Sequence, residues 1–588
     1  MWGADLFKCN RIDYVVPNHA NDLYYPKYKE AGIRFINIDP YYNETAEMFD
    51  AEWIKIRPNT DVALALGMMH YLYTTGKYNK EFIAKYTDGF EKFLPYLLGE
   101  SDGIPKDIIW ASKITEVEES KIKELCDLFV SQSTFIAGNW AMQRAQYGEQ
   151  ADWALINLAC MIGQIGTPGG GIGFSMHYAG GGQANSGYRT TPGLSQGRSR
   201  VEFSIPASRV SECILNPGKS INFKGKIITF PEIKMIYCCG ATLLGHHPNT
   251  NELIRAIRSV DTVVHEPWWT PMAKMADVVL PSTCTMERDD ITSGSTYSRN
   301  VIYAMKKIVE PTYEHRDDFS IFADLAKKVG GEEKYNQYTG GLSYMDWIKK
   351  FYASSDGPIF KEFDQFWEDG FVEFEGGDYD YVRHSDFRAD PVANKLATQS
   401  GKIQFFIDKF EEANIPDMKG HVTWFEPSEY LGSKEVKQYP FHMLSPHPRY
   451  RIHSQLDNTW VRDVYKIQGR EPLIINTNDA QKLGIKHGEV VEVYNARGAV
   501  LVGAFVTDKI REGVVQIQEG AWYDPENTND KLPRCNAGAC NVLTSSRPTS
   551  RWAQATSVNT CLVNIRKLGK DEIVRPYKST LSPEIIGA

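Results

Sequence analysis

The sequence predicts an α/β protein in which two doubly wound, Rossmann-like domains precede a C-terminal β-barrel. Over the first half of the chain, short apolar runs typical of buried strands alternate with segments of helical periodicity. This alternation favours mostly parallel sheets. From about residue 441 onward, short segments of period-two alternation separated by turns replace it, as is typical of a barrel.

The first domain is expected over residues 1–165. Its apolar runs predict strands at 33–38 and 135–137. Helical periodicity predicts an apolar helix over 61–73 and a second helix over 149–162. Each predicted helix follows a strand and a polar turn, which is the order of a parallel α/β sheet.

The second domain is expected over residues 166–330 and repeats this alternation. Strands are predicted at 235–239, 262–265 and 277–280, with a helix at 252–259 between the first two. The repetition indicates a second layer of the kind that binds nucleotides.

The remainder divides into a connecting region over 331–435, rich in aromatic, glycine and charged residues, and the barrel over 436–588. The fold of the connecting region stays open at this stage. Barrel strands are predicted at 472–476, 490–494 and 500–506.

Composition excludes several classes of protein. The 588 residues include 65 Lys+Arg and 74 Asp+Glu, a net charge of −9 without basic runs, which argues against binding nucleic acid. A membrane span needs about 18 consecutive apolar residues, and we expect none. The ten cysteines lack CxxC spacing, which predicts reduced thiols and neither a disulfide framework nor a zinc or iron–sulfur site. With no export signal visible, the chain as given is expected in the cytoplasm.

Two familiar motifs are discounted. Gly193-Leu194-Ser195-Gln196-Gly197 matches a nucleophile elbow, but its flanks resemble turns where that elbow needs a strand and a helix. Gly218-Lys219-Ser220 resembles the end of a phosphate-binding loop without the preceding strand, so we interpret it as a surface turn. A hydrolase based on Ser195 is therefore only a weak hypothesis.

Acidic side chains recur near the expected ends of strands in the first domain: Asp5, Asp39 and Asp61. Ligands of open α/β sheets bind at this edge. A carboxylate there could accept two hydrogen bonds from the edge of a guanine base. Each acid taken alone is better explained as a helix cap or a solvated loop residue.

Two glycine clusters, at 169–171 and 180–182, predict a loop without regular structure whose backbone approaches a ligand closely. Gly171 is therefore a candidate contact. His177, between the clusters, would offer a ring nitrogen beside that backbone.

Four further candidates follow the predicted strand at 135–137: Trp140, Met142, Gln143 and Arg144. A large ring, an amide and a guanidinium could hold a planar heterocycle and a phosphate. The alternative is a core tryptophan beside a surface arginine.

In the second domain, His247 follows His246 and precedes Asn251, where a strand gives way to a helix. We treat His247 and Asn251 as candidate ligand contacts. Adjacent histidines do not suit a zinc site, because zinc ligands usually lie on one helix face or on separate elements.

The barrel region contains a turn-rich loop with an unusual density of polar side chains. Its candidate contacts are Ser445, His447, Arg451, His453, Ser454 and Gln455. Asn541 and Gln554 add polar groups near strand ends, although these could simply satisfy turns.

Taken together and in their order along the chain, the motifs resemble those of the dimethyl sulfoxide reductase family of bis(molybdopterin guanine dinucleotide) enzymes. The resemblance is to the trimethylamine N-oxide and biotin sulfoxide reductase branch in particular. The matching segments are Trp2-Gly3-Ala4-Asp5, Ile38-Asp39-Pro40, Gly148-Glu149-Gln150, Met161-Ile162-Gly163-Gln164-Ile165-Gly166, His265-Glu266-Pro267-Trp268-Trp269-Thr270, Ala276-Asp277-Val278-Val279-Leu280-Pro281, Glu287-Arg288-Asp289-Asp290, the His447 to Gln455 loop, Tyr494-Asn495-Ala496-Arg497-Gly498, Glu519-Gly520-Ala521-Trp522, Asn541-Val542-Leu543-Thr544 and Gln554-Ala555-Thr556-Ser557.

The resemblance implies that each α/β domain holds one pterin guanine dinucleotide, that a double-psi barrel closes over both, and that molybdenum reduces an N-oxide or S-oxide. It adds Trp2, Thr242, Glu266 and Asp289 to the cofactor contacts. Thr242 and Asp289 stand where the family usually has Asn. The implied electron donor is a c-type cytochrome, a quinol-linked protein or a thioredoxin-like protein.

The family's serine ligand of molybdenum lies upstream of its Trp-Gly-Ala-Asp segment, where this chain starts. We therefore assign neither a catalytic residue nor a metal ligand. The alternative hypothesis is a truncated or split-gene fragment that binds pterin dinucleotide but is inactive without a separate N-terminal piece. A twin-arginine signal in that piece would imply a periplasmic location.

Overall fold

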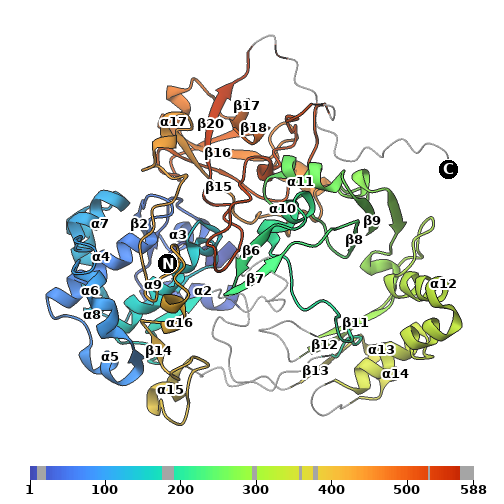
Figure 1. Cartoon of the computed structure of the whole chain (residues 1–588), viewed down its shortest axis with the longest axis horizontal. Coiled ribbons are helices and arrows are strands. Elements are labelled where there is room, and N and C mark those ends of the chain that lie inside the picture. Colours follow the sequence, from blue (N-terminus) through green and yellow to red (C-terminus); the bar gives the residue numbers. More distant parts are fainter. Residues whose placement is uncertain are drawn as a thin grey trace.

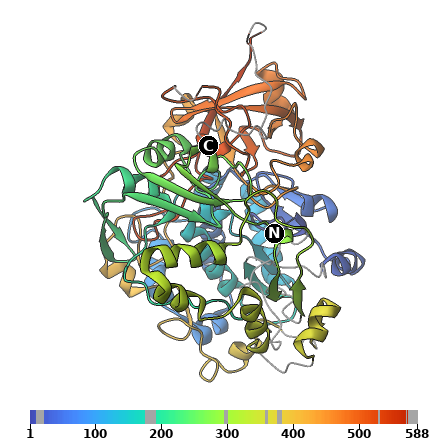
Figure 2. The ribbon, with the colours of Figure 1, turned by 90° about the vertical axis from the view of Figure 1, so that its right-hand side faces the viewer.

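The computed structural model describes residues 1–8, 21–174, 191–293, 301–355, 361–374, 382–527, 530–569 and 572. Figure 1 shows the barrel at one end of the molecule, with the first α/β unit beneath it on one side and the second on the other. The quarter-turn view in Figure 2 keeps the barrel at that end. The predicted α/β chain with a C-terminal barrel is therefore confirmed. Among the described helices, none is long and apolar enough to cross a membrane.

The first unit is built on two parallel strand pairs. Its strands are β1 (Ile36–Ile38), β2 (Glu52–Ile54), β4 (Phe135–Gly138) and β5 (Gly171–Phe174). β1 pairs with β2 and β4 with β5, while Trp2 bridges Ile38 and Gly138 and so joins the pairs. The strand predicted at 135–137 is confirmed, and the one predicted at 33–38 begins only at Ile36.

Gly171 starts β5, so the expectation of irregular structure there is wrong. Its nitrogen donates to the Thr134 carbonyl at 3.0 Å. Ile172 and Phe174, which follow in the same strand, pack against the core and supply the apolar contacts that glycine lacks. The backbone does approach another part of the chain closely here, because a Cβ at Gly171 would lie 3.1 Å from the Ile165 Cα. The predicted contact of Gly171 with a ligand stays a prediction.

Helices and short segments surround this sheet. They are α2 (Asn21–Glu30), α3 (Glu44–Met48), α4 (Asp61–Thr74), α5 (Lys80–Tyr86), β3 (Thr87–Asp88), α6 (Phe90–Leu97), α7 (Ile108–Thr115), α8 (Glu119–Ser131), η1 (Met142–Arg144) and α9 (Gly148–Ile162). The predicted helices at 61–73 and 149–162 correspond to α4 and α9. Because α4 is apolar on nearly all sides, it lies in the core against α7, α8 and α9.

The second unit contains the parallel sheet that the sequence predicts. Its strands are β8 (Met235–Cys239), β9 (Asp261–Glu266) and β10 (Val278–Pro281), in the order β10-β9-β8, and α11 (Thr250–Ile257) connects β8 to β9. Pro281 is tolerated because β10 is an edge strand. The unit also contains η2 (Ala207–Arg209), α10 (Val210–Leu215), the hairpin β6 (Ser220–Phe223) and β7 (Lys226–Thr229), η3 (Ala273–Met275) and η4 (Thr285–Glu287). Residues 193–197 form neither strand nor helix, which confirms that the serine motif lacks its required setting.

The connecting region divides between two cores. Its elements, with the strands they join, are β11 (Asp290–Ser293), β12 (Val301–Met305), α12 (Asp318–Thr339), α13 (Tyr344–Ala353), α14 (Phe363–Asp369), β13 (Phe371–Glu373), α15 (Ser385–Ala389), β14 (Ile403–Gln404), α16 (Asp408–Glu412) and η5 (Lys434–Lys437). Ile348 and Phe366 form a separate core on the β11-β12-β13 sheet. Phe387, Phe405 and Val422 instead join the core of the first unit.

The C-terminal region forms a closed six-stranded barrel in the order β15-β19-β16-β18-β17-β20. Its elements are β15 (Phe441–Leu444), η6 (Trp460–Val464), β16 (Pro472–Asn476), α17 (Thr477–Lys482), β17 (Val490–Asn495), β18 (Gly498–Thr507), β19 (Val514–Ile517), η7 (Cys540–Val542) and β20 (Leu562–Lys567). The three predicted strands are confirmed. β15–β19 and β16–β18 are parallel pairs in an otherwise antiparallel barrel.

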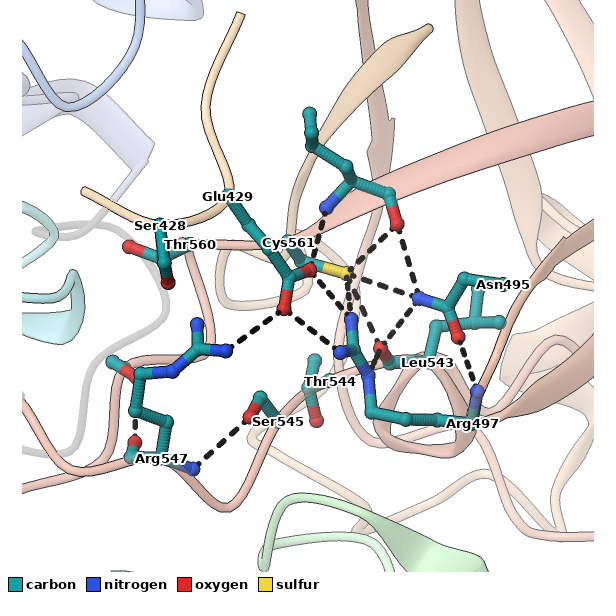
Figure 3. A network of polar contacts seen from close by, with 12 residues as sticks. Ser428, Glu429, Asn495, Arg497, Leu543, Thr544, Ser545, Arg547, Thr560 and Cys561 are labelled. Carbon is teal, nitrogen blue, oxygen red and sulfur yellow. Dashed lines mark hydrogen bonds and ion pairs between the residues drawn. The ribbon is translucent and has the colours of Figure 1, made fainter. Parts of the chain in front are cut away.

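Arg497, at the turn between β17 and β18, is the centre of the polar network in Figure 3. Its Nη1 and Nη2 donate to the two carboxylate oxygens of Glu429 at 2.9 and 2.8 Å, and its Nε donates to the Leu543 carbonyl at 2.6 Å. Glu429 also accepts from the Leu562 nitrogen at 3.1 Å. The network therefore ties the end of the connecting region to three segments of the barrel.

We expect Arg497→Met to lower the free energy of unfolding by about 2 kcal/mol, because it removes a bidentate, largely buried ion pair and leaves Glu429 with the Leu562 nitrogen and a longer contact of 3.4 Å to Arg547. Urea denaturation measures the change. Asp127→Asn, which removes the exposed Lys77–Asp127 pair, is the control and should leave the midpoint unchanged. Equal effects of the two substitutions would show that the Arg497 network does not hold the barrel.

Candidate functional site

The barrel meets both α/β units through side chains that the sequence analysis selected. Arg144 donates to the Thr556 hydroxyl at 2.9 Å on the side of the first unit. On the side of the second unit, Asn541 donates to the Gly245 carbonyl at 3.0 Å and Asn251 to the Arg497 carbonyl at 2.9 Å. The predicted contacts from three separate regions therefore converge along one seam.

The loop that follows β15 lies between the two units. Lys8 Nζ donates to the His447 carbonyl at 2.6 Å, and Arg449 forms an ion pair of 2.7 Å with Glu44, so the loop contacts the first unit. The rings of His246 and His453 lie 4.9 Å apart, which places the same loop against the second unit.

Glu519 organises the histidines of this loop. It accepts from His447 Nδ1 at 2.8 Å and from His453 Nδ1 at 2.6 Å. Burial alone would raise the pKa of Glu519, but these bonds outweigh it and hold the pKa well below its usual range. The neighbouring Gly520 cannot be replaced freely, because its φ is +87° and a Cβ would lie 2.2 Å from the His453 carbonyl oxygen.

Arg451 anchors the loop from within the barrel. Its guanidinium donates to Glu471 at 3.0 Å, to the Tyr465 hydroxyl at 2.8 Å and to the Glu519 carbonyl at 2.7 Å. Burial disfavours the charged form, yet Glu471 and its neighbours raise the pKa of Arg451 above its usual value. Because these donors of Arg451 are bound to protein atoms, Arg451 positions the loop.

The three acids of the first unit form one cluster and also make local bonds. Asp5 accepts from the Thr45 hydroxyl at 2.7 Å, Asp39 from the Tyr41 nitrogen at 2.8 Å, and Asp61 from Trp2 Nε1 at 2.8 Å. Burial, with the charges of Asp5 and Asp61, raises the pKa of Asp39 to about 7. The cluster gathers three carboxyl groups in one place, which suits a ligand that offers hydrogen-bond donors.

We expect the contribution of Asp39 to the free energy of unfolding of the ligand-free chain to fall as the pH rises from about 4 to about 7. Asp39 titrates at about 7 when folded and at about 4 when unfolded, so the folded state binds more protons in this window. Asp39→Asn should weaken this dependence and raise the melting temperature at pH 8 relative to the wild type. If Asp39→Asn lowers the melting temperature, relative to the wild type, by the same amount at pH 4 and at pH 8, the raised pKa of Asp39 is contradicted.

Where the second unit meets the barrel, several buried polar atoms have no protein partner in the described part of the chain. Three of them are His247 Nδ1 and Asn251 Oδ1 of the second unit and the Tyr523 hydroxyl of the barrel. Asn251 and Tyr523 line a cavity of about 530 Å³ between α11, η3 and the barrel segment 523–533. Buried polar groups in native proteins nearly always have a partner, so these atoms are suited to bind a polar ligand.

The same cavity has a lining of mixed charge, with the cations Arg255, Arg258, Lys274 and Lys531 beside the acids Asp524, Glu526 and Asp530. Arg255 and Arg258 come from α11 and the turn after it, and Lys274 from η3. Glu266 lies outside this lining, at the end of β9, where it accepts from the Thr270 hydroxyl at 3.2 Å and burial raises its pKa to about 7. A cavity lined by both cations and acceptors suits a ligand that carries both phosphate and hydrogen-bond donors.

Other predicted contacts are used by the protein itself. Thr242 donates to the Leu244 carbonyl, Asp289 accepts from the Lys307 nitrogen after β12, Ser445 contacts Cys540 Sγ at 3.0 Å, and Gln554 accepts from Arg209 and donates to the Asn222 carbonyl. Met142 packs near Gly3, Trp140 and Gln143 are partly exposed, Ser454 accepts from Trp522 through its carbonyl, and Gln455 is exposed. His177 lies outside the described residues.

The sequence alone does not single out Glu519, Tyr523, Thr556 or the cavity's cations as site residues. Glu519 and Thr556 stand in segments that matched the family pattern, so that pattern was the available signal. Arg255, Arg258 and Lys274 belong to a mixed-charge surface pattern, and only the fold shows that they face one cavity.

Comparisons with known proteins agree with this geometry. Residues 1–328 match the family model described as "Molybdopterin oxidoreductase", and residues 441–562 the one described as "Molydopterin dinucleotide binding domain". The chain is 42% identical to the trimethylamine-N-oxide reductase of Haemophilus influenzae, with 96% of this chain and 71% of the relative covered. It is also 42% identical to the dimethyl sulfoxide/trimethylamine N-oxide reductase of Rhodobacter capsulatus, covering 96% of this chain and 70% of that protein.

A solved structure shares the fold at much lower sequence identity. Acetylene hydratase from Pelobacter acetylenicus superposes with a TM-score of 0.66 at 18% identity, covering 95% of this chain and 77% of that one. This likeness concerns the arrangement of the α/β units and the barrel.

Proposed function

The chain belongs to the dimethyl sulfoxide reductase family of molybdopterin oxidoreductases, and from this membership we propose that it binds two molybdopterin guanine dinucleotides and one molybdenum to reduce an N-oxide or S-oxide. Trimethylamine N-oxide, dimethyl sulfoxide and biotin sulfoxide are the proposed substrates. One observation carries the proposal: side chains from both α/β units contact one loop of the barrel.

In this proposal, each α/β domain holds one nucleotide and the barrel closes over both. We keep the boundaries 1–165 and 166–330 for the two Rossmann-like domains, 331–435 for the connecting region and 436–588 for a double-psi barrel. The partnerless atoms of His247, Asn251 and Tyr523 support the fit, because a bound nucleotide would supply their missing partners.

The guanine base of one nucleotide would meet the acids of the first unit. The base has two adjacent donors, N1–H and N2–H₂, and Asp5, Asp39 and Asp61 offer carboxyl oxygens as acceptors. Arg144 is exposed at the end of η1, so it could bind a phosphate while it keeps its hydrogen bond to Thr556.

The second nucleotide would lie along the cavity beside α11. Arg255, Arg258 and Lys274 would face the phosphates, in a lining that also contains Asp524, Glu526 and Asp530. Glu266, at the nearby end of β9, would supply an acceptor for a base or ribose. Asn251 already fixes the barrel through its amide nitrogen and would use its free oxygen toward the ligand.

The bound metal and its pterins supply the two-electron transfer of an oxygen atom, and the chain supplies shape, charge and hydrogen bonds. His447 and His453 are held at Nδ1 by Glu519, so their Nε2 atoms have a fixed direction. We propose a c-type cytochrome, a quinol-linked protein or a thioredoxin-like protein as the electron donor.

The direct test is molybdenum content together with oxidation of a reduced viologen dye by each of the three substrates. We expect about one molybdenum per chain and turnover that depends on the N-oxide or S-oxide. Pterin and molybdenum without turnover, restored by adding the N-terminal portion of a longer relative, would favour the alternative of a fragment that binds cofactor. Absence of pterin would overturn both.

We expect Asn251→Ala to reduce the retained pterin nucleotide several-fold, because it removes the free oxygen and the bond that positions α11 against the barrel. Cofactor released by denaturation and quantified by fluorescence measures the loss. Asn216→Ala, at the end of α10, is the matched control and should retain the wild-type amount. Equal retention in all three proteins would remove Asn251 from the site.

A further inference from the structure

Three side chains that can bind metals meet on the second unit, outside the seam described above. Cys239 ends β8, His265 lies in β9 and Asp318 is in the first turn of α12. One ligand atom from each residue lies within 4.8 Å of the others. The three come from separate elements, so the group exists only in the folded chain.

The sheet geometry separates this group from the proposed nucleotide site. Cys239 and His265 are register partners on adjacent parallel strands, so their side chains point to the same face. Cys238 and Glu266, the neighbours in sequence, point to the opposite face, where Cys238 packs with Leu253 of α11. The cluster therefore lies on the face that α12 covers.

The imidazole of His265 is fixed on both sides. Its Nε2 contacts the Tyr237 hydroxyl at 2.8 Å and its Nδ1 contacts Asp318 Oδ1 at 2.7 Å. Phe322 stacks on the ring with centroids 5.0 Å apart and an interplanar angle of 28°. Metal-binding histidines commonly use their second nitrogen in this way, to hold the ring in one orientation.

The separations suit a small tetrahedral site. Bonds of about 2.0–2.3 Å to zinc put neighbouring ligand atoms roughly 3.3–3.6 Å apart. Cys239 Sγ and Asp318 Oδ1 already lie 3.5 Å apart, and the His265–Asp318 contact would lengthen by about half an ångström. Asp318 has 42% of its side chain exposed, so an ion can enter from solvent.

We propose that Cys239, His265 and Asp318 bind a zinc-class divalent cation, with water as the fourth ligand. A thiolate and a carboxylate would neutralise the two positive charges, and a neutral imidazole would complete the protein ligands. The Nε2–H of His265 would then donate to the Tyr237 oxygen. The ion joins the start of α12 to β8 and β9 and does not depend on the pterin cofactor.

The test compares zinc content after equilibration with zinc and removal of the excess. We expect the wild-type protein to retain about one zinc more per chain than Cys239→Ser or Asp318→Asn. Cys284→Ser, which removes another partly exposed free thiol, is the matched control and should retain the wild-type amount. A second group that could hold a metal consists of His447, His453 and Glu519. His447→Gln removes one of its ligands and should also keep the additional zinc.

Cobalt provides an independent readout. Cobalt added to the wild-type protein should give a thiolate-to-metal band in the near-ultraviolet difference spectrum, and Cys239→Ser should lose it. Zinc should raise the melting temperature of the wild type and not that of Asp318→Asn, which keeps the thiol and tests the site if the cysteine variant folds poorly. Equal zinc in the wild type, Cys239→Ser and Asp318→Asn, or no thiolate band with cobalt, would overturn the proposal.

Discussion

The ion pair between Arg497 and Glu429 is the contact on which the arrangement of the three regions depends. Both nitrogens of the guanidinium fork are bound to one carboxylate, and Nε is bound to the carbonyl of Leu543. The carbonyl of Arg497 is in turn the acceptor for Asn251 of the second unit. One residue thus joins the connecting region, the barrel and the second sheet.

This constraint explains how groups from distant parts of the chain form one seam. The barrel alone offers a loop with buried charges, and each sheet alone offers polar residues at its edge. With the barrel held in place, the loop at His447 and His453 contacts both units, and the cavity beside α11 acquires a wall from the barrel segment at Tyr523. A long polyanionic ligand requires this combination of cations, acceptors and close backbone approach.

Local patterns in the sequence predicted much of the fold, because the apolar periodicity of a helix or strand depends only on consecutive residues. The strands β8, β9, β16 and β17 and the helix α4 follow directly from apolar periodicity. The failure at Gly171 has a physical reason: glycine permits many conformations without excluding a strand, and its neighbours decide. The fold of the connecting region could not be predicted, because its aromatic side chains join two cores that are far apart in sequence.

The candidate site was predictable only in part. Arg144, Asn251 and Asn541 proved to lie at the seam, whereas the partners that fix them are distant in sequence. Spacing rules for cysteine missed the group at Cys239 for the same reason, because strand register and a helix terminus bring its members together.

The amount of GMP released by acid hydrolysis of the purified protein tests most directly whether each α/β unit holds its own nucleotide. Two GMP per chain, with one molybdenum, are expected if both units bind a pterin guanine dinucleotide. One GMP per chain, or none, would contradict the arrangement of two nucleotides under one barrel.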